Sequence, residues 1–159
     1  MASNRHLGRI IALQSLYEQD FRLDCGDKGF VLEDVLKRNI DRYKDMVEDR
    51  DFIVRLVNGV NDKHAEIDKL LQPIAPDWPI ENIARMDRTV LRIGTYELLF
   101  EQDVPPKVVI NESVELAKAF GGDNSSKFIN GVLGTVLRNQ EEEKKKKPKK
   151  AVKPKKDKK

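Results

Sequence analysis

Two phenylalanines and a lysine stand where one predicted helix ends and the next begins. Phe120 closes the first helix, and Phe128 opens the second with Lys127 beside it. Amide groups at a helix N-terminus, together with a lysine, suit a phosphate group. The two rings can stack on unpaired bases, each stack being worth about 1–3 kcal/mol. The alternative is that both rings belong to the hydrophobic core, and their spacing alone favours that alternative.

A second group of candidate binding residues lies near the N-terminus. Arg5, His6 and Arg9 cluster at the start of a helix predicted over residues 5–23. Positive charge at that end is unfavourable for the helix dipole. The cluster is therefore either an ordinary solvated helix end or an arm that contacts phosphates, and the residues alone favour the solvated end.

The sequence contains no motif for catalysis, a cofactor or a metal ion. Gly121-Gly122 ends a helix and fits neither GxGxxG nor a Walker sequence, and CxxC and HExxH are absent. His64 has no Cys or His partner at ligand spacing, so a structural or surface role is expected. We therefore expect a protein that is not an enzyme and has no cofactor or metal site.

The binding candidates depend on helices to position them. Pro105 and Pro106 pre-set the first turn of a helix that reaches Phe120, and its apolar residues recur with helical period. Asp123, Asn124 and Ser125 are all good N-cap residues for the next helix, which runs to about residue 137. Further helices are expected over 30–46, from an Asp49 or Asp51 cap to 71, over 80–85 and over 87–100.

The prolines of residues 72–79 divide this pattern in two. We predict an all-α bundle of two three- to four-helix subdomains without a β-sheet. The body covers residues 1–138, with an N-terminal half at 1–72 and a C-terminal half at 80–138. The length of 159 residues is that of one domain.

Residues 139–159 form a lysine-rich tail that is expected to be disordered, apart from one extra helical turn. They hold 11 Lys against four acids, a net charge of 11 − 4 = +7. The whole chain carries +3, so residues 1–138 carry 3 − 7 = −4. Nucleic-acid affinity must therefore come from a local basic patch or from the tail.

Targeting signals are also missing from the sequence. No apolar run approaches the roughly 20 residues of a membrane span, and the N-terminus lacks an apolar signal-peptide core. The single cysteine, Cys25, cannot form an internal disulfide, which fits a reducing compartment. These features predict a cytoplasmic protein.

Three segments resemble the NusB family of transcription antitermination factors. They are IALQSLYEQD at 11–20, DRTVLRIGTYELLF at 87–100 and VVINESVELAKAFGGDNSSKFINGVL at 108–133. Their order and separations also match, so the likeness runs from about Arg5 to Leu137. Three collinear segments are far more specific than one short motif.

The resemblance implies an adaptor that binds boxA-type single-stranded RNA together with the ribosomal protein NusE. Such a pair helps RNA polymerase to read through ribosomal RNA operons. The resemblance assigns Tyr17 and Asp87 to the protein partner. It assigns the following residues to RNA: Arg5, His6, Arg9, Phe120, Lys127 and Phe128.

Two alternatives remain at the level of sequence. One is a helical protein-interaction module, or a homodimer, with little RNA binding; Leu7 and Gly8 interrupt the arginine run of the family, and the body is acidic. The other is part of an enzyme, because a NusB-like domain precedes the catalytic domain of a ribosomal-RNA cytosine methyltransferase. The 21-residue tail is too short to supply such a catalytic domain.

Overall fold

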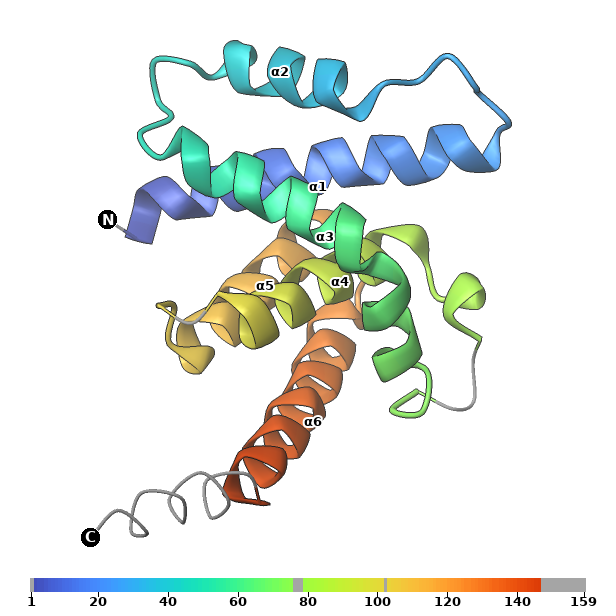
Figure 1. Cartoon of the computed structure of the whole chain (residues 1–159), viewed down its shortest axis with the longest axis vertical. Helices are drawn as coiled ribbons and strands as arrows, with labels where there is room; N and C mark the ends of the chain where they lie inside the picture. Colours follow the sequence, from blue (N-terminus) through green and yellow to red (C-terminus); the bar gives the residue numbers. More distant parts are fainter. Residues whose placement is uncertain (1, 76–78, 102, 147–159) are drawn as a thin grey trace, which may run out of the picture.

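The computed structural model describes residues 2–75, 79–101 and 103–146, and this part of the chain is helical without any β-strand (Figure 1). The prediction of an all-α fold is therefore confirmed. The helices are α1 (Ala2–Asp24), α2 (Leu32–Arg42), α3 (Arg50–Leu71), the 3-10 helix η1 (Ile80–Asn82), α4 (Arg85–Phe100), α5 (Pro106–Phe120) and α6 (Ser125–Lys146). None of these helices is long and apolar enough to cross a membrane.

Helix ends follow the local chemistry of the sequence. The Asp49 side chain caps α3 by accepting a hydrogen bond from the Phe52 amide at 3.1 Å. Of the two predicted cap residues, Asp49 and Asp51, the cap is therefore Asp49. Pro106 occupies the first turn of α5, where its missing N–H leaves no bond unmade. The predicted short helix at 80–85 is smaller than expected: η1 spans Ile80–Asn82, and α4 begins at Arg85.

Helix α4 lies at the centre of the molecule. It packs against α1, α3, α5 and α6, and ten of its 16 residues are buried. In Figure 1, α3 crosses α1 and continues towards α4, α2 lies along the far side of α1, and α6 runs away from the other helices towards the C-terminus. A residue on α4 can therefore be linked directly to either the N-terminal or the C-terminal helices.

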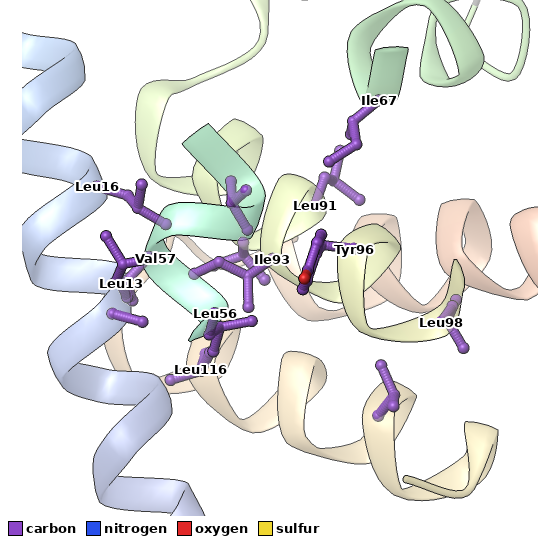
Figure 2. Packing of buried hydrophobic residues seen from close by; sticks show 14 of the residues in the cluster. Leu13, Leu16, Leu56, Val57, Ile67, Leu91, Ile93, Tyr96, Leu98 and Leu116 are labelled. Atoms are coloured by element: carbon purple, nitrogen blue, oxygen red, sulfur yellow. The ribbon is translucent and has the colours of Figure 1, made fainter. Parts of the chain in front are cut away.

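One hydrophobic core runs through both halves of the chain. Leu13 of α1, Leu56 of α3, Ile93 of α4 and Leu116 of α5 are almost completely buried in it (Figure 2). Burying such a side chain contributes about 1.5–3 kcal/mol. The proline-containing segment thus separates α1–α3 from α4–α6 along the chain, while their apolar faces meet in space.

Two glycines allow α4 to approach its neighbours closely. A Cβ atom on Gly59 of α3 would lie 2.2 Å from Cζ of Tyr96, and one on Gly94 would lie 2.7 Å from Ser113 Oγ and Leu133 Cδ1. Such distances leave no room for a methyl group, so these glycines set the spacing of α3, α5 and α6 around α4. Gly131, in contrast, faces open space.

Helix α6 continues to Lys146, further than the one extra turn expected beyond residue 138. Gln140 holds this extension by donating from Nε2 to the Leu98 carbonyl at 2.9 Å. In this extension glutamates precede lysines by four residues, as at Glu141 and Lys145, and such pairs stabilise a helix. Lysines near the C-terminus also interact favourably with the helix dipole. Residues 147–159, predicted to be disordered, lie outside the described residues.

Candidate nucleic-acid interface

A groove borders the first turn of α6. It has a volume of about 600 Å³ and lies between this turn and the segment that joins η1 to α4. Asp87 of α4 thus lines the same groove as Lys127 and Phe128, although the family resemblance assigned Asp87 to the protein partner and the other two residues to RNA. The complete lining is Asn82, Ile83, Ala84, Asp87, Asn124, Ser125, Lys127 and Phe128.

The two candidate phenylalanines are at the surface, but neither is fully solvated. Phe128 is half-buried and packs on the core, while also lining the groove. Phe120, at the end of α5, has 37% of its surface exposed. Lys127 is exposed. The start of α6 therefore presents an aromatic ring supported from behind and a cation beside it, which are the groups that hold a base and a phosphate.

The basic side chains at the start of α1 face carboxylates. Arg5 donates from Nη2 to Asp49 Oδ2 at 3.2 Å, and its Cζ lies 4.3 Å from the centre of the Phe52 ring. His6 Nδ1 lies 2.7 Å from Glu112 Oε1 on α5. Arg5 and His6 remain partly accessible, with 27% and 40% of their side chains exposed.

Arg9 has a structural position instead of a surface one. Its guanidinium donates two hydrogen bonds of 2.7 Å to the Glu97 carboxylate of α4, and its side chain is only 3% exposed. Burial raises the pKa of Glu97, and the hydrogen bonds from Arg9 oppose that rise. The predicted RNA contact by Arg9 does not fit this burial, because the guanidinium is shielded from solvent and already paired with the Glu97 carboxylate of α4. Arg9 joins α1 to α4 beneath Arg5 and His6.

The candidate partner residue Tyr17 belongs to an aromatic surface on α1. Tyr17 is half-buried, and Arg85 Cζ lies 5.9 Å from its ring centre. The same guanidinium lies 5.3 Å from the ring centre of Phe21, which is 48% exposed. Phe21 was missed at the level of sequence; its spacing of four residues from Tyr17, on one face of a helix, was the available signal.

Arginines of α4 hold this surface in place through Asp20. Arg85 and Arg88 donate to Asp20 Oδ2, and Arg92 pairs with Asp68 of α3 at 2.7 Å. Burial acts to raise the pKa of the Asp20 carboxyl, but the hydrogen bonds and charges of these arginines outweigh it, so the pKa lies below its ordinary value. The network therefore keeps α1, α3 and α4 in register. Within residues 2–75, 79–101 and 103–146, no cluster of His, Cys, Asp and Glu could hold a metal ion.

Comparison with known proteins identifies the family of this chain. The model of the NusB family matches residues 6–138. The chain belongs to the NusB family. It is 44% identical over 149 residues to the transcription antitermination protein NusB of Dehalococcoides mccartyi strain CBDB1, covering 90% of this chain and 100% of that protein. The protein of the same name from Chloroflexus aggregans is 42% identical over 139 residues, covering 86% and 89%.

Solved structures show the same NusB fold. NusB of T. maritima is 32% identical, with a TM-score of 0.75 over 84% of this chain and 90% of that one. A structure of the antitermination factors NusB and NusE in complex with dsRNA has a TM-score of 0.75 at 24% identity, covering 87% and 99%; at that identity it supports the fold alone. Membership of the NusB family makes this chain a transcription antitermination factor and not an enzyme.

Proposed function

We propose that this NusB-family protein binds boxA-type single-stranded RNA together with NusE in the cytoplasm, and that the assembly supports read-through of ribosomal RNA operons by RNA polymerase. The observation that carries the proposal is the groove at the start of α6. It brings Lys127 and Phe128 to the surface beside Asp87. The protein acts as an adaptor that holds a nucleic acid and a protein and makes no covalent bond.

The groove offers single-stranded RNA an aromatic ring for a base and a cation for a phosphate. Phe128 rests on the core, so its ring is held in place before a base arrives. A base stacked on such a ring contributes about 1–3 kcal/mol, and this contribution depends little on base identity. Lys127 adds a phosphate contact that weakens as salt concentration rises. Phe120 offers a second aromatic surface at the end of the preceding helix.

The partner surface adjoins the RNA groove. Asp87 lines the groove, and Arg85, two residues earlier on α4, contacts the ring of Tyr17. NusE bound over Tyr17 and Asp87 would therefore stand beside RNA bound at Lys127 and Phe128. We expect each ligand to raise the affinity for the other by the same factor, because coupling between binding sites is reciprocal.

Binding to boxA-type and scrambled RNA, measured with and without NusE, tests this function. Tighter binding of the boxA-type RNA, with a preference that grows when NusE is added, is the expected result. Equal affinity for the two RNAs in the presence of NusE would contradict the proposal.

The ion pairs at the start of α1 favour a second candidate, a helical protein-interaction module or homodimer with little RNA binding. Arg5, His6 and Arg9 each face a carboxylate, which lowers their attraction for phosphate. Sedimentation at increasing protein concentration separates the candidates. Self-association without measurable binding of boxA-type RNA, even with NusE, would favour this module.

A further inference from the structure

We propose that Asp49 restrains Arg5 and thereby sets how tightly the start of α1 holds an RNA phosphate. The inference rests on the proposed function, in which Arg5 contacts RNA. It assigns a role to a residue outside the groove and outside the family-derived set. Asp49 would act as a competitor of the RNA backbone for one guanidinium.

The geometry places Arg5 between an aromatic ring and carboxylates. Its guanidinium lies over Phe52, with Cζ 4.3 Å from the ring centre. Its Nη2 donates to Asp49 Oδ2 at 3.2 Å, and Nη1 lies 3.8 Å from Asp103 Oδ2. The ring covers one face of the guanidinium, so a phosphate has to approach the N–H groups that the two carboxylates already face.

Asp49 cannot easily turn away to admit a phosphate. Its Oδ1 atom accepts the hydrogen bond from the Phe52 amide that caps α3, while Oδ2 faces Arg5. The helix therefore fixes the carboxylate whether or not Arg5 is bound to it. Asp103 is different, because its side chain is 66% exposed and only the longer contact ties it to Arg5. Asp49 is thus the stronger competitor.

The surroundings of Arg5 carry more negative than positive charge. Three arginines stand at this end of the molecule, and each has its guanidinium near the Phe52 ring. Five carboxylates contact these arginines. With His6 neutral the sum is 3 − 5 = −2, so an approaching phosphate meets net repulsion. The groups are Arg5, Arg9 and Arg55, facing Asp49, Glu97, Glu101, Asp103 and Glu112.

The pair of Arg5 and Asp49 is exposed enough to exchange. Their side chains are 27% and 40% exposed, in contrast to the buried pair of Arg9 and Glu97. Half-exposed ion pairs are weak, so a phosphate can replace the carboxylate on Arg5 without disturbing the core. Removing the charge of Asp49 should therefore strengthen RNA binding without unfolding the protein.

The substitution Asp49→Asn tests the restraint, because Asn keeps the oxygen that caps α3 and loses the charge. Asp51→Asn is the matched control: Asp51 is exposed in the first turn of the same helix and has no ion pair with Arg5. With full-length protein, NusE and boxA-type RNA, we expect Asp49→Asn to raise the affinity about two- to fivefold above the control. Asp103→Asn should give a smaller rise, and it leaves the cap of α3 untouched.

The double variant Arg5→Gln with Asp49→Asn should bind RNA no better than Arg5→Gln alone. Equal affinities for Asp49→Asn and Asp51→Asn, or a gain that persists without Arg5, would overturn the restraint. If Arg5→Gln weakens binding while Asp49→Asn matches its control, the proposed function stands and the restraint is wrong. If neither the natural chain nor Asp49→Asn binds boxA-type RNA with NusE present, both proposals fail.

Discussion

Lys127 and Arg9 carry the same charge in opposite surroundings. Lys127 stands in water beside the groove, and Arg9 is enclosed between α1 and α4 with its charge matched by Glu97. A charge in water can meet a ligand, whereas a buried charge mainly fixes the positions of two helices. Substitutions at these positions should therefore separate binding from stability.

Replacing Phe128 by Ala should weaken binding of boxA-type RNA about five- to 100-fold, because one base loses its stacking surface. Phe128 is half-buried, so the loss of stability should be smaller than the ~3–5 kcal/mol of a fully buried phenylalanine. Filter binding and thermal unfolding measure the two effects. Phe100→Ala is the control, since Phe100 is 38% exposed at the far end of α4. RNA binding that is unchanged in a stable Phe128→Ala variant would exclude the stacking role.

Replacing Arg9 by Ala should destabilise the protein by about 3–5 kcal/mol, because the buried Glu97 carboxylate loses its partner. Lys127→Gln should change stability by less than about 0.5 kcal/mol, as is usual at the surface. Urea unfolding measures both. Arg9→Leu combined with Glu97→Leu removes both charges and should recover part of the loss. A stable Arg9→Ala variant with weakened RNA binding would instead restore the original assignment of Arg9 to RNA.

The site was predictable from sequence only where a side chain's surroundings follow from its own helix. Lys127 opens a helix and is exposed, as its position suggested. For Phe128 the spacing alone favoured the core, and the ring is half-buried against that core. Arg9 precedes Leu13 and Leu16 by four and seven residues, so it lies on the apolar stripe of α1. That spacing signals burial, but its partner Glu97 lies 88 residues away, and no local pattern joins the two.

At the scale of elements, close packing around α4 depends on glycine. Gly59→Ala should destabilise the protein by about 1–3 kcal/mol, since the new methyl group would overlap the Tyr96 ring. Gly131→Ala should instead stabilise the protein by up to about 1 kcal/mol, because alanine favours the helix more than glycine does. Open space beside Gly131 leaves room for the new methyl group. Thermal unfolding of both variants tests the assignment. Equal effects would mean that α3 and α4 can move apart without loss.

The ion pairs of Asp20, which join α1 to α4, should make the stability of the protein depend on pH. Because the arginines lower the pKa of Asp20 in the folded protein, its contribution to stability is present above the unfolded pKa of about 3.9. That contribution is lost as the pH falls through the lower, folded pKa. We expect Asp20→Asn to lose on the order of 2–3 kcal/mol at pH 7. In unfolding measurements the difference from the natural chain should shrink as the pH falls below the unfolded pKa and through the lower, folded pKa of Asp20. A difference that grows in acid would contradict the direction of the shift.

Helices were the most predictable elements, and their ends the least. Apolar residues with a period of 3.6 located α1 to α6, because one face of each helix must be buried. The end of α6 was placed too early, since the composition after residue 138 has no apolar period. The hydrogen bond from Gln140 to the Leu98 carbonyl joins helices 42 residues apart, and charges in favourable order continue the last turns.

At the scale of the whole molecule, positive charge is concentrated beyond the described helices. Residues 147–159 contain eight lysines. A chain truncated after Lys146 keeps α6 and its bond to Leu98. We expect truncation to lower the affinity for boxA-type and scrambled RNA equally and to flatten the dependence on salt, because lysine acts through phosphates and counterion release. Titrations at several salt concentrations measure both quantities. If truncation leaves the dependence of RNA affinity on salt unchanged, a role in solubility would explain the tail better.

The long-range ties of α1 also have a consequence during synthesis on the ribosome. Arg9 cannot form its ion pair until Glu97 has been synthesised, 88 residues later. His6 cannot contact Glu112 until 106 further residues have been added. At about 5–20 residues per second, the nascent first helix spends about 5–20 s without these partners. Until α4 emerges, only α2 and then α3 can cover its apolar face. The start of α1 therefore gains its partners in steps: Arg5 can pair with Asp49 first, Arg9 pairs with Glu97 once α4 emerges, and His6 reaches Glu112 only when α5 emerges.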